Sequence, residues 1–149
     1  MARMYVARMD AVAVTGAITL VQVTAPSSGI LRVSEVWLSQ SNLTSGATQR
    51  VALNRKSGAA TVTSFTPVPL AVGSPASSAT AGYNASAEGS DSTLIITDAF
   101  NWLSGWRWTA IDERSMIIVP PSGIFCVRLP VAPAASTTIT AGIEWEEIA

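Results

Sequence analysis

The chain of 149 residues contains no histidine, one cysteine and one lysine. Without histidine, the common catalytic triads, histidine general bases and most zinc sites are excluded. The single Cys126 excludes an intrachain disulfide. It lies in the apolar run 124–127, which is typical of a small hydrophobic residue packed in a strand. We therefore expect no chemistry based on a thiol or an imidazole.

Charge and long apolar runs are also scarce. Charged residues make up 13% of the chain and the net charge is −1, so no basic excess is present to neutralise a nucleic-acid backbone. No run approaches the roughly 18 apolar residues of a membrane-spanning helix, and residues 1–8 lack the pattern of a secretory signal. We expect no nucleic-acid partner, no membrane span and synthesis in a cytoplasm without standard secretion.

Motifs for cofactors and metals give little support for catalysis. Neither glycine-rich phosphate-binding pattern occurs. Asp91 and Asp98 flank a predicted strand and could ligate Ca²⁺, although aspartates at such places more often form turns. The paired carboxylates that a glycosidase would need are limited to Asp112 with Glu113, and Glu144 with Glu146 and Glu147. Glu144 and Glu146 fall on the polar face of the last predicted strand, which indicates a solvated edge. We predict no catalytic residue, cofactor or metal, and hence a protein that is not an enzyme.

Small neutral residues replace the missing charge. The sequence has 23 Ala, 18 Ser and 15 Thr, whereas a free cytosolic monomer usually keeps a charged surface for solubility. One explanation is that partner subunits cover the surface. The alternatives are a protein that works outside the cell at high local density and an unusual soluble monomer. We favour assembly.

Hydrophobic alternation indicates strands along nearly the whole chain. The clearest case is the segment 138–146, where Ile139, Ile143 and Trp145 alternate with polar residues. The segment 30–40 is predicted to place Leu31, Val33 and Trp37 on one face and Val36 on the other. We predict about eight or nine strands in one domain, residues 1–149, folded as a jelly-roll-type β-sandwich.

Further predictions concern individual segments. A short buried strand is expected at 93–97, and one helical turn at 98–101. The turn residues 120–123 predict a hairpin between strands at 115–119 and 124–129.

The segment 69–92 interrupts the pattern of strands. It consists mainly of Ala, Ser, Gly, Thr and Pro, and no charged residue lies between Lys56 and Glu88. Loops of this length are uncommon inside compact domains unless they are functional or disordered. Low charge favours burial against another molecule. We predict a long loop that serves as an assembly arm, with a floppy excursion as the alternative.

Aromatic residues gather in the segment 100–108. The candidate contact residues are Trp102, Trp106, Arg107 and Trp108, joined by Tyr83 of the long low-charge segment. Such rings could stack on sugars. Tryptophan also fills cores and anchors interfaces, and this second role is the favoured interpretation.

The C-terminal third resembles small structural proteins of tailed bacteriophages, such as head decoration, or cement, proteins. The resemblance lies in residues 100–108, 112–114, 119–123, 128–130 and 143–148. It implies a jelly-roll-like fold, oligomers seated on a capsid lattice and no catalysis. The expected protein is therefore a virion component that forms a homo-oligomer, expected to be a trimer, and binds the major capsid protein.

Two other functions are consistent with the sequence. One is a carbohydrate-binding β-sandwich module on a phage fibre or surface, and the other is a structural component of the tail or neck. Quenching of tryptophan fluorescence by glycans would favour the first.

Overall fold

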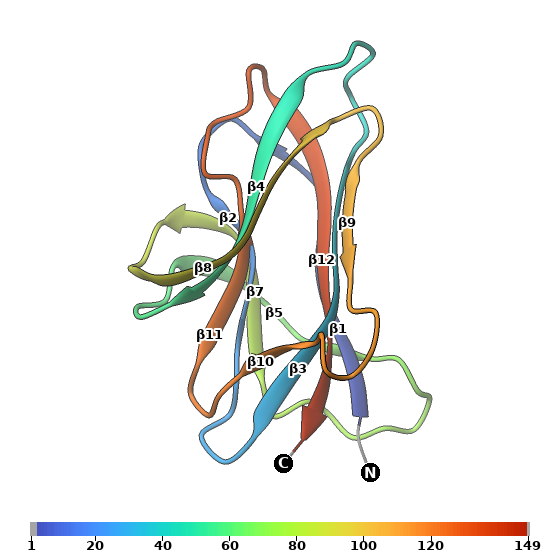
Figure 1. Cartoon of the computed structure of the whole chain (residues 1–149), viewed down its shortest axis with the longest axis vertical. Helices are drawn as coiled ribbons and strands as arrows, with labels where there is room; N and C mark the ends of the chain where they lie inside the picture. The colour runs from blue at the N-terminus through green and yellow to red at the C-terminus, as the bar shows by residue number, and fades with distance from the viewer. Residues whose placement is uncertain (1–2, 149) are drawn as a thin grey trace.

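The computed structural model describes residues 3–148, which form strands and turns without a helix. Two six-stranded sheets, with every pairing antiparallel, pack face to face as a β-sandwich (Figure 1). This confirms the all-β sandwich, while the jelly-roll strand order stays a prediction. The described strands number twelve rather than eight or nine. They are β1 (Arg3–Val14), β2 (Thr19–Thr24), β3 (Ile30–Gln40), β4 (Thr48–Lys56), β5 (Thr61–Phe65), β6 (Val68–Pro69), β7 (Thr80–Ala87), β8 (Asp91–Asn101), β9 (Trp106–Thr109), β10 (Ile117–Val119), β11 (Ile124–Arg128) and β12 (Thr137–Ile148).

The first sheet has the order β10-β3-β12-β1-β6, and β9 also pairs with β3. The second sheet has the order β5-β7-β2-β11-β4-β8. Strands β9 and β10 therefore follow one edge of the first sheet, and the two-residue strand β6 forms the other. The termini come together because β1 and β12 are neighbours over almost their full length.

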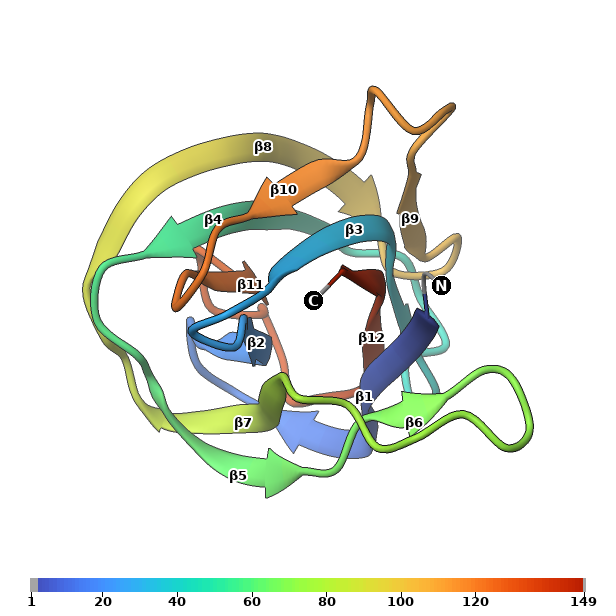
Figure 2. The same ribbon diagram turned by 90° about the horizontal axis from the view of Figure 1, so that it is seen from below.

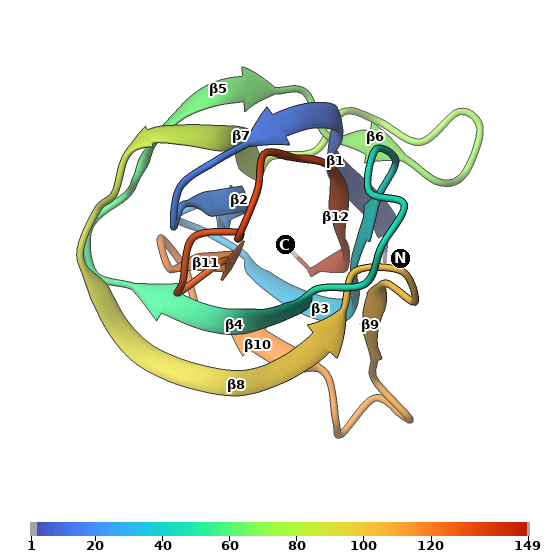
Figure 3. The ribbon, with the colours of Figure 1, turned by 90° about the horizontal axis from the view of Figure 1, so that it is seen from above.

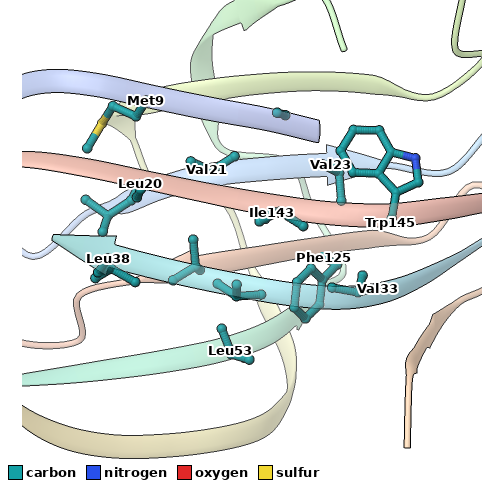
Figure 4. Packing of buried hydrophobic residues seen from close by; sticks show 14 of the residues in the cluster. Met9, Leu20, Val21, Val23, Val33, Leu38, Leu53, Phe125, Ile143 and Trp145 are labelled. Carbon is teal, nitrogen blue, oxygen red and sulfur yellow. The ribbon is translucent and has the colours of Figure 1, made fainter. Parts of the chain in front are cut away.

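The core fills the space between the sheets with aliphatic side chains and a few large rings (Figure 4). Trp145 is the largest of the fully buried side chains, and its ring centroid lies 6.2 Å from that of Tyr5. Ile139, Ala141, Ile143 and Trp145 are all 0% exposed, which confirms the alternation predicted for β12. The buried Trp145 Nε1 has no hydrogen-bond partner.

The prediction of which β3 side chains face the core is wrong beyond Val33. Val36 is buried on the core side, whereas Trp37 lies on the outer face and is half-buried. The pairing with β12 skips Ser34, since Glu144 pairs with Glu35 and Trp145 with Val33. This β-bulge adds one residue to β3, and one extra residue exchanges the two faces of a strand.

The predicted hairpin at 120–123 is also wrong. β10 pairs with β3 in the first sheet, whereas β11 pairs with β2 and β4 in the second. The turn is tight, because Gly123 N–H donates to the Pro120 carbonyl at 2.8 Å, but it carries the chain from one sheet to the other. The strand at 93–97 is part of the longer β8, which is an edge strand exposed along most of its length. Residues 98–101 belong to this strand and not to a helical turn.

The segment 69–92 is only partly a loop. Residues 70–79 form a loop that projects from the body, whereas Thr80–Ala87 form β7, between β5 and β2 (Figure 2). β7 lies close to its neighbour β5: a Cβ added at Gly82 would lie 2.3 Å from Val62 Cγ2. The predicted arm is thus confined to residues 70–79, and a deletion of 71–87 would remove a strand from the second sheet.

Two connections cover the outer face of the second sheet. Residues 57–60 lead from β4 to β5 and residues 88–90 from β7 to β8, and they bond to each other through Ser57, Gly58 and Ser90. We call residues 57–60 and 88–90 the strap. It buries polar residues of the sheet below, and the Ala60 N–H donates to Gln22 Oε1 at 2.9 Å.

A buried ion-pair network holds the strap in place. The fully buried ammonium of Lys56 lies 3.2 Å from Glu88 Oε2 and 2.9 Å from Asp91 Oδ1. Asp91 also pairs with Arg128, and Thr19 Oγ1 donates to Glu88 Oε2 at 2.7 Å. Burial lowers the pKa of Lys56, but its hydrogen bonds to Asp91 and Glu88 outweigh this and leave the pKa raised. The ammonium therefore stays charged at neutral pH.

Candidate interaction surfaces

The predicted tryptophan cluster does not form one surface. Trp102 is buried, and its ring packs edge-on against Phe100, with centroids 4.8 Å apart. Trp106 and Trp108 pair with Leu38 and Val36 and pack against the core at the edge of the sandwich. Their rings therefore close the edge between the sheets.

A hydrogen bond joins the two sheets at this edge. Trp106 Nε1 donates to Asp98 of β8 at 3.0 Å. This bond, together with the Ala99 N–H, lowers the pKa of the Asp98 carboxyl. Asp98 thus serves as an acceptor for tryptophan rather than as part of a group of cation ligands.

Arg107 lies on the opposite face of β9, above Trp37. Its guanidinium carbon is 5.8 Å from the centre of the Trp37 ring, and Glu35 forms an ion pair with it. The Trp37 ring also lies against Gly142, where an added Cβ would fall 2.1 Å from Trp37 Cζ2. A pocket of about 430 Å³ borders these residues. Trp37 is therefore packed between a guanidinium and a glycine.

Tyr83 lies away from the tryptophans, on β7. Its ring meets Phe65 edge-on, with centroids 6.5 Å apart, and the guanidinium of Arg8 lies 5.8 Å from the centre of the Phe65 ring. A small pocket of about 190 Å³ is lined by these three residues with Asp10 and Val12. The predicted contact residues thus occupy a core site, a sheet edge, an outer face and a separate pocket.

The carboxylates have structural partners. Arg32 bridges Glu146 at 2.9 Å and Glu113 at 3.4 Å. Glu147 is buried, accepts from the Ser78 N–H at 2.9 Å and also accepts from the Ser77 hydroxyl. Within residues 3–148, no cluster of three or more His, Cys, Asp or Glu could hold a metal ion.

The thiol of Cys126 is shielded beneath the strap. Its burial raises its pKa to about 12, a value that leaves it protonated and unreactive at neutral pH.

Strand β6 and the loop 70–79 that follows it expose three apolar side chains beside a sheet edge. Val68 is 41% exposed, Leu70 51% and Val72 fully exposed. We call β6 with residues 70–79 the edge loop; Figures 2 and 3 show that it stands out from the body. A groove of about 660 Å³ runs between its residues 70–75 and the start of β1 at Arg3 and Met4.

Hydrogen bonds to β1 and β12 fix the base of the edge loop. The Leu70 N–H donates to the Met4 carbonyl at 2.9 Å, the Tyr5 hydroxyl donates to the Pro75 carbonyl at 3.0 Å, and Glu147 accepts from the Ser78 N–H. The tip at 71–74 is stabilised by a single turn bond, from the Ser74 N–H to the Ala71 carbonyl. The loop is thus anchored at both ends while its apolar tip faces solvent.

Comparisons of the chain with protein-family models, with curated proteins and with solved structures found no match. Residues 3–148 include no helix with the length and apolar character needed to cross a membrane.

Proposed function

We propose that this chain is a non-enzymatic structural protein that self-associates through the edge loop. The observation that carries the proposal is the exposure of Val68, Leu70 and Val72 on one anchored projection. Exposed apolar clusters of this kind mark interaction sites on soluble proteins. Each side chain gains about 1.5–3 kcal/mol when it is fully transferred from water to an apolar contact.

The position of this surface suits strand addition. β6 is the terminal strand of the first sheet, so an extended segment of another molecule can pair beside it, although Pro69 supplies no N–H for such a ladder. Main-chain bonds to such an edge give affinity, and neighbouring side chains give specificity. A short edge strand beside apolar residues can therefore join subunits with few specialised groups.

The proposed setting is a virus particle. The low charge, the absence of a catalytic set from the sequence and the resemblance to phage head proteins support a decoration, or cement, protein that stabilises the shell. In this proposal it forms a homotrimer, binds the major capsid protein and enters the virion in the host cytoplasm. A component of the tail or neck would use the same surface.

The glycan-binding alternative has weaker support. A sugar platform needs a free aromatic face, whereas Trp37 is covered by Arg107 on one side and Gly142 on the other. Trp102 is buried in the core. A saturable change of tryptophan fluorescence with glycans would restore this alternative.

The experiment is the double substitution Leu70→Ser with Val72→Ser, measured by sedimentation velocity. We expect the wild type to form an oligomer and the double variant to dissociate at least ~10-fold more readily, because a loss of about 1.4 kcal/mol changes an equilibrium tenfold. Leu103→Ser, which changes another exposed leucine outside the edge loop, is the matched control and should associate as the wild type does. Equal association of all three proteins would refute the role of the edge loop.

A further inference from the structure

Another pocket lies on the outer face of the second sheet, beside the strap. Its volume is about 210 Å³, and small Ala52 stands between longer side chains on β4. The lining residues come from β4, β8, β11 and the segment after β11: Arg50, Ala52, Asn54, Leu94, Thr97, Arg128 and Pro130. The size suits one short side chain rather than a large ligand.

Two buried polar groups of this lining have no partner. Asn54 is only 6% exposed, and its Oδ1 accepts no hydrogen bond. The Nε of Arg128 is likewise buried and unpartnered. A buried polar group without a partner lowers stability, so a ligand that satisfied both groups would gain from a site already formed.

The hydrogen-bond donors that line the pocket favour an anionic ligand. The guanidinium of Arg50 donates to Thr97 Oγ1 at 3.1 Å, and in residues 3–148 it forms no ion pair. The terminal amide of Asn54 can turn to present its NH₂ group in place of Oδ1. Arg50, Asn54 and the Nε of Arg128 can then all donate into one space, while the Nη1 of Arg128 stays paired with Asp91. A carboxylate is the side-chain group that accepts several such bonds at once.

We propose that this pocket binds a carboxylate, and that its occupant is Glu113 of a second copy of the chain. Glu113 lies in the loop 110–116 between β9 and β10, which projects from the body (Figures 2 and 3). The side chain of Glu113 is 83% exposed and pairs with Arg32 at 3.4 Å, a contact that it would exchange for Arg50 of the second copy. Ile111 is 96% exposed, so the loop offers an acid and an apolar residue together.

The rim of the pocket matches this loop. Leu94 on the lining and Val131, next to Pro130, are both exposed. Ile111 can pack against them when Glu113 reaches Arg50. The contact joins two different surfaces of the chain, so repeating it produces a closed ring or an open chain. This inference rests on the proposed self-association and adds a second, charged contact to the apolar edge loop.

The test is a charge exchange measured by sedimentation equilibrium. We expect Arg50→Glu and Glu113→Arg each to weaken association at least tenfold, since each places like charges at the contact. An equimolar mixture of the two variants should recover most of the loss. The Glu113 loop of the first variant meets the intact Arg50 pocket of the second, and the arginine loop of the second meets the glutamate pocket of the first. Arg8→Glu, an exposed arginine outside the pocket, is the control for the charge change and should leave association unaltered.

Association of Arg50→Glu at wild-type strength would overturn the inference, and so would a mixture that stays as weak as its components. If the wild type is itself monomeric, the proposed function fails and the pocket is tested alone with sodium acetate. We then expect saturable shifts of the Asn54 side-chain amide signals in NMR spectra of the wild type, and none in Arg50→Ala. No shift in the wild type would overturn the pocket as well.

Discussion

The first part of the strap, residues 57–60, and the edge loop belong to one stretch of chain without charge, yet their environments differ. Residues 57–87 contain no charged side chain, and the two charges that bound them, Lys56 and Glu88, pair with each other. The strap lies flat on the second sheet and is held by buried ion pairs and backbone bonds. The edge loop projects from the first sheet and presents Leu70 and Val72 to solvent.

Small, neutral residues thus occur both in a segment packed on a sheet and in a loop exposed to solvent. Small neutral residues let the two parts of the strap lie close together, since a Cβ added at Gly89 would fall 2.0 Å from the Gly58 carbonyl oxygen. In the edge loop the same lack of charge keeps the surface around the apolar tip neutral. The strap therefore completes the fold, and the edge loop is free for a partner.

The largest loss of stability is expected from a substitution in the core, on which the strap and the edge loop both depend. Trp145→Ala removes the largest fully buried side chain of the core and should lower the free energy of unfolding by about 3–5 kcal/mol. Urea unfolding, followed by circular dichroism, provides the measurement. Trp145→Phe should cost less, because it also removes the buried Nε1–H that has no partner. A loss below about 1 kcal/mol for the alanine variant would mean that Trp145 does not lie in the core.

Lys56→Met should destabilise the strap and leave the edge loop intact. The substitution leaves Glu88 and Asp91 without their buried cation, and we expect the free energy of unfolding to fall by about 2–3 kcal/mol. This is less than the ~3–5 kcal/mol lost when a fully buried pair is broken, because both acids are partly exposed. Arg107→Met, which breaks the exposed pair with Glu35, should cost under about 1 kcal/mol in the same urea titration. Similar losses for the two variants would show that the network does not hold the strap.

Part of this fold could be predicted from sequence. The alternation in β12 placed Trp145 inside because the strand is regular over the segment 138–146. The phase of Trp37 could not be predicted, since the bulge at Ser34 depends on its pairing with β12. The turn at 120–123 has the residues of a hairpin, but the partners of β10 and β11 are distant in sequence. Local pattern therefore finds strands and turns, and long-range pairing decides which sheet each strand joins.

Glu147→Ala should loosen the edge loop and leave the strap unchanged. Loss of the carboxylate leaves the Ser78 N–H and the Ser77 hydroxyl without an acceptor, at a cost of about 1–2 kcal/mol. Amide exchange should become faster at Ser78 and Ala79 but stay the same at Ser90. Glu144→Ala, on the outer face of β12, should stay within about 0.5 kcal/mol of the wild type. Equal exchange rates in the wild type and Glu147→Ala would show that this carboxylate does not anchor the loop.

The candidate sites were less predictable than the fold. The sequence indicated that the segment 69–92 was unusual, but β7 is rich in Ala and has a single β-branched residue, Thr80, of the kind typical of strands. The tryptophans are conspicuous in the sequence by their number, whereas the exposed apolar side chains of the edge loop include Leu70 and Val72, which no sequence pattern singles out. The buried Asn54 and the partners of Lys56 depend on strands far apart along the chain.

The most direct test of the central claim is hydrogen–deuterium exchange at two protein concentrations, one below and one above the onset of association. The proposed assembly predicts that amides of residues 70–74 become protected as concentration rises, while those of 57–60 and 88–90 keep the same protection at both. Exchange in the edge loop that is equally fast at both concentrations would contradict its role in self-association.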